Sequence, residues 1–173
     1  MNRYYPILQG HIFIAREGDG TPAVTKAAPP AHDSASWIKL GETIDAELSA
    51  EIETATRTAI QIGKRVKIDE VIAETFTLKG TIQELNKLVL DLFFGSTTTA
   101  TDAFIATGSQ GRKAWVRFQA YDQANANRSL LEGFAMIRPA GPLTVAGEDF
   151  FQAEFDMVFE GRPSGTVTSA YPA

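Results

Sequence analysis

The stretch RVKIDEVIAETFTLKGTIQELNKLVLDLFFG, residues 65–95, decides the fold class of this chain. Its first part, residues 66–79, is rich in Val, Ile, Thr and Phe without one clean alternation, which predicts a long strand with a bulge. Its second part predicts a helix over residues 82–93, because apolar residues recur there every three or four positions. This apolar stripe consists of Ile82, Leu85, Leu88, Val89, Leu92 and Phe93.

The chemistry of the flanking residues predicts where this helix begins and ends. Thr81 and Glu84 fit a capping box, in which the threonine hydroxyl accepts the Glu84 backbone N–H and the glutamate accepts the Thr81 N–H. Gly95 is expected to end the helix in a left-handed conformation. The remainder of the chain has the patterns of strands and loops, so we expect a mainly β protein with one helix packed on a sheet.

Alternation of apolar and polar residues predicts further strands at residues 37–53, 113–121 and 150–160, and runs of β-prone residues predict strands at 7–15 and 129–139. For residues 37–53 a helix is the alternative, because Ile44, Leu48 and Ile52 are also four apart; the longer alternation favours a strand. Residues 54–64 fit a turn or a continuation of this strand. Residues 96–104 are predicted to be a hydroxyl-rich loop and residues 108–113 a hairpin turn.

Two segments lack any periodicity. Residues 16–36 contain three prolines and few large apolar residues, and we expect a long mobile loop there. Residues 161–173 are expected to form an extended C-terminal arm. With 173 residues and 44% hydrophobic content, the chain is predicted to fold as a single domain covering residues 1–173.

The composition argues against several classes of protein. The chain has no cysteine and only two histidines, His11 and His32, which leaves no pattern for a metal site, a cofactor or a hydrolytic triad. We therefore do not expect an enzyme. No apolar run approaches the roughly 18 residues of a membrane span, and the N-terminus lacks a signal peptide pattern. A net charge of −5 opposes general binding to nucleic-acid phosphates.

Two of the predicted strands carry rows of carboxylates on one side. Between residues 44 and 53, apolar residues alternate with Asp45, Glu47, Ser49, Glu51 and Glu53. Between residues 150 and 160, an aromatic side containing Phe155 alternates with Gln152, Glu154, Asp156 and Glu160. We expect the carboxylates to face outward and the aromatic side to lie in the core or in a subunit interface.

Three features together resemble the major tail tube proteins of long-tailed bacteriophages, and more remotely the inner-tube subunits of contractile tails and secretion systems. They are Trp37-Ile38-Lys39-Leu40-Gly41 before an acidic alternating strand, the strand and helix of residues 66–94, and the strand of residues 150–160. The resemblance implies an antiparallel β-sandwich or small barrel with one flanking helix near residues 82–93. It also implies a structural virion protein that forms stacked, hexameric rings around a channel for DNA.

The resemblance implies roles for individual residues. Carboxylates expected to face the channel are Asp45, Glu47, Glu51, Glu53, Glu154 and Asp156. Side chains expected to anchor the core or a subunit interface are Trp37, Trp115, Leu88 and Phe155. The implied partners are other copies of the chain and the terminator, tape measure and distal tail proteins. DNA would pass without specific binding, and the protein would lie in the virion tail after a period in the host cytoplasm.

Two alternatives remain at this point. One is another ring-forming tail or head-tail connector protein on the same fold, which would be present in one ring per particle. The other is a solitary β-sandwich binding module, which would need a clustered aromatic platform; Trp37 and Trp115 are too few to form one.

Overall fold

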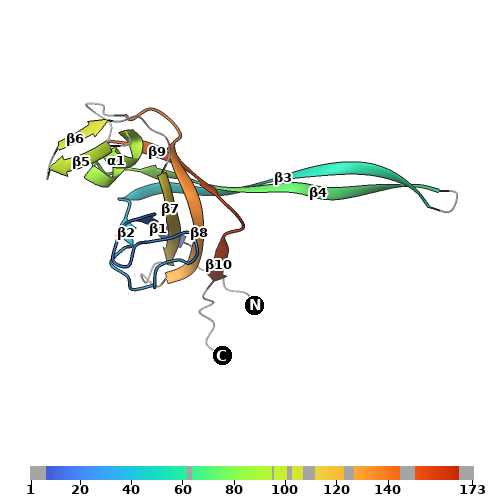
Figure 1. Cartoon of the computed structure of the whole chain (residues 1–173), viewed down its shortest axis with the longest axis horizontal. Helices are drawn as coiled ribbons and strands as arrows, with labels where there is room; N and C mark the ends of the chain where they lie inside the picture. The colour runs from blue at the N-terminus through green and yellow to red at the C-terminus, as the bar shows by residue number, and fades with distance from the viewer. Residues whose placement is uncertain are drawn as a thin grey trace.

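The structure, a computed structural model, describes residues 7–61, 64–94, 96–100, 103–106, 112–122, 127–144 and 151–167 (Figure 1). Within these residues the chain is mainly β, as predicted, with a single α-helix. The elements in chain order are β1 (Ile7–Arg16), β2 (Ile38–Lys39), β3 (Thr43–Gln61), β4 (Lys64–Ile82), α1 (Lys87–Phe94), β5 (Ser96–Ala100), β6 (Ala103–Ala106), β7 (Arg112–Asp122), β8 (Asn127–Pro139), β9 (Ala153–Phe159) and β10 (Ser164–Val167).

One antiparallel sheet in the order β2-β1-β7-β8-β9-β4-β3 contains most of the strands, and β10 pairs with β8. The sheet curls so that β1 crosses over β4: a Cβ added to Gly80 would lie 2.6 Å from Ile12 Cδ1. Between the described strands no hydrogen-bonded ladder joins β2 to β3. The expected small barrel is therefore open, and the two halves of one curled sheet enclose the core.

The core lies between these halves and below α1. It draws side chains from β1, β4, α1, β7, β8 and β9. Its buried members are Ile12, Ile14, Leu40, Leu78, Ile82, Val89, Leu92, Ala114, Val116, Ala135, Ile137, Ala153, Phe155, Met157 and Phe159. On β9 every second side chain from Ala153 to Phe159 is buried, which confirms the alternation read from the sequence.

The helix is shorter than predicted and has a different cap. Thr81 and Ile82 stay in β4, because Ile82 pairs with Thr43 on one side and Ala153 on the other. Asn86 caps the helix: its Oδ1 accepts the Val89 backbone N–H at 2.9 Å. The predicted capping box is wrong, and the Glu84 carboxylate instead accepts the Glu42 N–H at 3.1 Å. Leu85, expected in the apolar stripe, is 55% exposed in the connection before α1.

The long strands follow the prediction in type, but the strand predicted over residues 37–53 is interrupted near Gly41, whose φ is 138°: Ile38–Lys39 form β2 beside β1, and β3 begins at Thr43. Residues 43–61 form a strand, so the helical alternative for this segment was wrong and residues 54–61 continue the strand. β4 contains the expected bulge, because Ala73 pairs with Glu53 and Val71 with Thr54, leaving Ile72 without a partner. The strands predicted around residues 7–15, 113–121, 129–139 and 150–160 correspond to β1, β7, β8 and β9.

Two segments predicted to lack strands contain them. The hydroxyl-rich segment forms β5 and β6, a separate two-stranded sheet beside α1 (Figure 1). Its threonines are β-branched and suit a strand as well as a loop. In the C-terminal segment, β10 pairs with β8 from Ser164 to Val167. The predicted cap at Gly95, most of the predicted turn at 108–113 and residues 168–173 lie outside the described residues.

β3 and β4 form a long hairpin that projects away from the rest of the fold (Figure 1). β9 supports β4 only from Ile82 to Thr77. Beyond that point β3 and β4 pair with each other alone, from the pair of Ala50 and Phe76 outward. We call this two-stranded part, residues 50–61 and 64–76, the hairpin arm.

Candidate assembly surfaces

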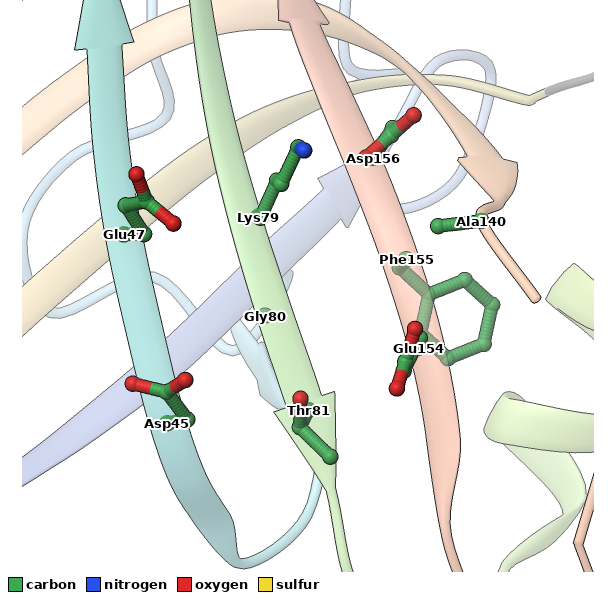
Figure 2. A pocket seen from close by; sticks show the side chains of 9 residues that line it. All are labelled: Asp45, Glu47, Lys79, Gly80, Thr81, Ala140, Glu154, Phe155 and Asp156. Carbon is green, nitrogen blue, oxygen red and sulfur yellow. The ribbon is translucent and has the colours of Figure 1, made fainter.

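The structure brings the two acidic rows together on one face of the sheet. In the register of β3, β4 and β9, Glu47 lies beside Lys79, which lies beside Asp156. Two residue pairs further along, Asp45, Thr81 and Glu154 are aligned across the three strands in the same way. Directly opposed residues project from the same side of an antiparallel sheet. Figure 2 shows the resulting surface, which holds a hollow of about 270 Å³ also lined by Gly80, Ala140 and Phe155.

This acidic face carries more negative than positive charge. Four carboxylates from β3 and β9 surround one lysine, Lys79 (Figure 2). Arg138 on β8 adds a second cation, with its Nη2 3.6 Å from Asp156 Oδ2. A face with a net negative potential repels phosphate groups. We call the surface formed by Asp45, Glu47, Glu154 and Asp156 the acidic face.

Glu51 and Glu53 lie on the same side of β3 as Asp45 and Glu47, but further along the strand, on the hairpin arm. Their cross-strand neighbours are Thr75 and Ala73. Because β9 ends its pairing with β4 at Thr77, these two carboxylates are not joined to Glu154 and Asp156. The six candidate carboxylates therefore divide into four on the body and two on the arm.

The opposite side of β3 is apolar and uncovered. Ile44, Leu48 and Ile52 are 50%, 49% and 56% exposed. The alternation in the sequence correctly places them on one side, but β3 is the last strand of the sheet and little of the body reaches over it. Val71 and Ile72 on the arm are also exposed. Along its outer edge β3 has no pairing strand among the described residues, which leaves its backbone N–H and C=O groups open.

Trp37 and Trp115, two of the predicted anchors, hold the loop of residues 16–36 against β7. The Trp115 indole donates to the Thr25 carbonyl at 2.9 Å, and the Trp37 indole donates to the Ala31 carbonyl at 3.1 Å. The Trp37 ring also covers the guanidinium of Arg117, with its centroid 3.9 Å from Cζ. Both indoles therefore make contacts within the subunit.

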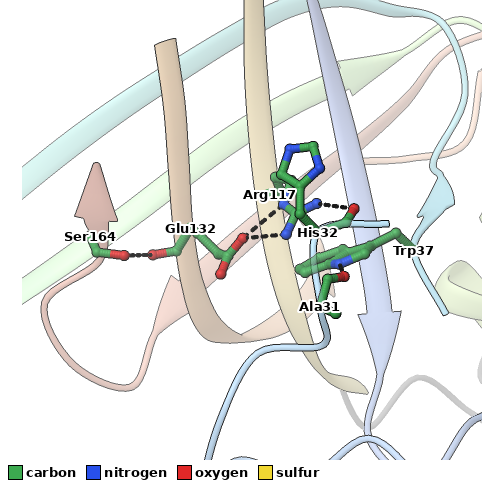
Figure 3. Close-up of polar contacts among 6 residues, drawn as sticks. All are labelled: Ala31, His32, Trp37, Arg117, Glu132 and Ser164. Carbon is green, nitrogen blue, oxygen red and sulfur yellow. Dashed lines mark hydrogen bonds and ion pairs between the residues drawn. The ribbon is translucent and has the colours of Figure 1, made fainter. Parts of the chain in front are cut away.

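Arg117 lies at the centre of this arrangement, and sequence reasoning missed it (Figure 3). It is 4% exposed and pairs with Glu132, its cross-strand neighbour on β8, through Nε and Nη2 at 2.7 Å each. Its Nη1 donates to the His32 carbonyl at 3.1 Å. The alternation of β7 assigned Arg117 to the polar side, which was correct. The sequence contained no signal that the loop covers that side.

The other two predicted anchors lie in or beside the core. Phe155 is fully buried, and its ring meets Phe93 edge to face at a centroid distance of 6.5 Å. Leu88 on α1 is partly buried and packs against the core cluster.

The described residues contain no group of three His, Asp or Glu side chains that could hold a metal ion. His32 is exposed in the loop, and Ser34 in the same loop accepts the Ser36 backbone N–H through its hydroxyl. His11 lies between the rings of Phe13 and Tyr121, and burial lowers its pKa below the ordinary value. No described helix is both long and apolar enough to cross a membrane.

Comparison with known proteins identifies the family. A family model described as phage tail tube protein matches residues 7–130, which include β1 to β7, α1 and the start of β8. The chain belongs to the phage tail tube protein family. No curated protein matches this tail tube protein.

Several solved structures are similar to it at low sequence identity. One is a chain of the baseplate of the anti-feeding prophage, with 7% identity, coverage of 96% of this chain and 98% of that chain, and a TM-score of 0.48. A chain of the sheath-tube complex of an extracellular contractile injection system has 11% identity, coverage of 95% and 93%, and a TM-score of 0.45. A chain of the tail of an empty gene transfer agent particle has 16% identity, coverage of 78% and 89%, and a TM-score of 0.42.

Family membership makes this tail tube protein a structural component of the phage virion, located in the tail. The acidic face, the uncovered side of β3 and the hairpin arm are therefore candidate surfaces for assembly with other copies.

Proposed function

We propose that this tail tube protein assembles into stacked hexameric rings that form the conduit for DNA ejection. The hairpin arm is the observation that carries this proposal. A two-stranded hairpin is marginally stable alone in water, yet this one extends well beyond the third strand that supports its base (Figure 1). It also exposes Ile52, Val71 and Ile72. An exposed apolar hairpin of this length needs a covering surface, and in a homo-oligomer another copy provides it.

The free edge of β3 supports ring formation. Its unpaired backbone groups can extend the sheet of a neighbouring subunit, and closure of the ring then leaves no exposed edge to cause aggregation. The apolar side of β3, with Ile44 and Leu48, would be covered in the same step.

The acidic face is proposed to line the channel, together with Glu51 and Glu53 where the arms follow the wall. Repeated rings of carboxylates repel the phosphates of DNA within about 8 Å at physiological salt, so the duplex is kept off the wall without being blocked. DNA passes without specific binding, and the protein has no enzymatic role.

Besides other copies, the partners are the terminator, tape measure and distal tail proteins, and the subunit waits in the host cytoplasm before assembly. The chain acts as a single domain with a mobile loop at residues 16–36 and an extended C-terminal arm at 161–173. Hydrogen bonds from Trp115 to the Thr25 carbonyl and from Arg117 to the His32 carbonyl attach the loop to β7 at two points.

Electron microscopy of concentrated purified protein tests the assembly. We expect tubes built of six-fold rings. Leu48→Lys places a charge on the uncovered side of β3, opposite the apolar Leu78, and should prevent tube formation, because a buried unpaired charge is costly. Glu47→Lys, one residue away on the opposite side of the same strand, is the matched control and should leave tubes intact. Monomers at all concentrations, or equal effects of both variants, would contradict the proposal.

A further inference from the structure

The ion pair between Arg162 and Glu74 lies where the hairpin arm leaves the body. Arg162 Nε is 2.6 Å from Glu74 Oε2, and its Nη2 is 2.8 Å from Glu74 Oε1. The two parallel hydrogen bonds form the bidentate geometry that gives an arginine-carboxylate pair a defined direction. Glu74 belongs to the arm, whereas Arg162 lies between β9 and β10.

The backbone around Arg162 is fixed to the body. The next residue, Pro163, lies 3.2 Å from the position of a Cβ added to Gly133 on β8. Ser164 begins β10, pairs with Glu132 and donates its hydroxyl to the Glu132 carbonyl at 3.4 Å (Figure 3). Arg162 therefore projects from an anchored segment toward the arm.

At the base of the arm the hairpin loses its third strand. The last pair between β4 and β9 joins Thr77 to Val158, and the bulge at Ile72 follows five residues further along β4. Bulges bend and twist a strand locally, and a two-stranded ribbon resists bending less than a wider sheet. Glu74 lies between these two points, so the ion pair acts on the segment that determines the direction of the arm.

We propose that Arg162 and Glu74 form a bracket that sets the angle at which the hairpin arm leaves the body, and that this angle positions the arm on the neighbouring subunit. This inference rests on the proposed assembly into tubes. From Glu74 to Lys64 the strand continues for ten residues, about 34 Å at 3.4 Å per residue. A rotation of about 10° at the base then moves the end of the arm by about 6 Å, more than the spacing of about 4.8 Å between paired strands.

The bracket contributes little to folding because it is exposed: the Arg162 side chain is 76% accessible. Its loss should therefore affect assembly more than stability. If the arm of a subunit without the bracket has the correct direction for about a third of the time, the apparent affinity of each contact between the arm and the neighbouring subunit falls about threefold.

The direction of the arm can be measured in the free subunit. The chain contains no cysteine, so Thr58→Cys on the arm and Lys87→Cys on α1 accept two spin labels without competing sites. Both positions are exposed. Distances between the labels should fall in a narrow distribution in the parent protein. They should broaden in Arg162→Gln and Glu74→Gln, and narrow again when Arg162→Glu is combined with Glu74→Arg.

Lys113→Gln is the matched control. Lys113 makes an exposed ion pair with Glu160 at 2.8 Å, two residues from Arg162, but that pair joins β7 to the end of β9 and does not reach the arm. Its removal should leave the distance distribution unchanged. High salt should broaden the distribution of the parent protein toward that of Arg162→Gln.

Tube formation by the same variants, followed by light scattering, completes the test. The subunit concentration needed for tubes should rise at least about threefold in both single variants and fall again in the charge-reversed pair. Unchanged distances in the single variants would overturn the bracket. Broadened distances with an unchanged concentration threshold would overturn its role in assembly. If the parent protein forms no tubes, the proposed function fails, and the distances in the free subunit still decide whether the bracket exists.

Discussion

Asn86 joins two parts of the fold through a single side chain. Its Oδ1 caps α1 by accepting the Val89 N–H, and its Nδ2 donates to the Leu40 carbonyl at 3.0 Å, which lies 46 residues earlier in the chain. The side chain therefore fixes both the start of the helix and its position over the segment before β3.

Asn86→Ala should lower the free energy of unfolding by about 1–2 kcal/mol, because a helix cap and a second hydrogen bond are lost together. Thr81→Ala is the control, since the sequence pattern pointed to Thr81 as the cap but the structure places it in β4. It should change stability by less than about 0.5 kcal/mol. Urea unfolding of the two variants measures both values, and a larger loss in Thr81→Ala would show that the helix begins earlier.

His11 is the residue whose titration should affect stability near neutral pH. Burial lowers its pKa below the ordinary value of 6.5, nearby Lys39 lowers it further, and Glu42 acts in the opposite direction. Its Nδ1 is buried without a hydrogen-bond partner. A proton is therefore bound more readily in the unfolded chain than in the folded protein.

Stability due to neutral His11 should be fully present above pH 6.5 and should be lost as the pH falls through the lower pKa of the folded state. In His11→Asn this part of the pH dependence should disappear, while the contribution of the carboxylates at lower pH remains. Urea midpoints of both proteins between pH 8 and pH 5 provide the measurement. Parallel curves over that range would exclude His11 as the cause.

The loop of residues 16–36 is the element whose position depends most on a few polar contacts. It lacks a large apolar surface, and it is attached to β7 by Trp115, Trp37 and Arg117. The pair of Arg117 and Glu132 beneath it is largely buried. Pairs of this kind contribute little net stability, but removal of one partner leaves an uncompensated charge.

Arg117→Met should destabilise the fold by about 3–5 kcal/mol because the Glu132 carboxylate loses its partner in a buried position. Combining it with Glu132→Leu should restore most of that loss. Hydrogen exchange at residues 25–37 should nevertheless be faster in both proteins, since each lacks the bond to the His32 carbonyl and the contact with Trp37. Exchange in the double variant equal to that of the parent would mean that Arg117 does not hold the loop.

For the whole molecule, the shared face of the two acidic rows determines how the channel can be tested. Glu47 on β3 and Glu154 on β9 lie on the same face. Comparing substitutions in one strand with substitutions in the other would therefore not show whether this face lines the channel or lies outside it. The test must instead compare this face with exposed carboxylates that are not part of it. Glu17 and Asp33 in the loop region provide them.

Glu47→Lys with Glu154→Lys should slow DNA ejection, because repeated lysines in each ring make contacts to phosphates along the channel. The delay should shrink as the salt concentration rises. Glu17→Lys with Asp33→Lys changes the net charge by the same amount and should leave ejection unchanged. Ejection rates from particles carrying either pair, measured across a salt series, test this. Equal rates in both pairs would place the acidic face outside the channel.

The sequence by itself determined the mainly β class, the alternating sides of β3, β7 and β9, the bulge in β4 and the presence of one helix. Each of these depends on side chains close together in the chain, where a period of two or of three to four residues is enough to identify the structure. The resemblance to tail tube proteins rested on the same local patterns.

Only the tertiary structure decided which surfaces come together. Asp156 lies on the same face as Glu47 because of the register of β3, β4 and β9. Arg117 is buried because the loop of residues 16–36 covers it. The helix begins at Lys87 because Ile82 is paired on both sides, and the arm begins where β9 ends. Alternation indicates the side of a strand on which a residue lies. The register between strands, and which segment covers a given side, depend on contacts between distant parts of the chain, and a local pattern holds no information about them.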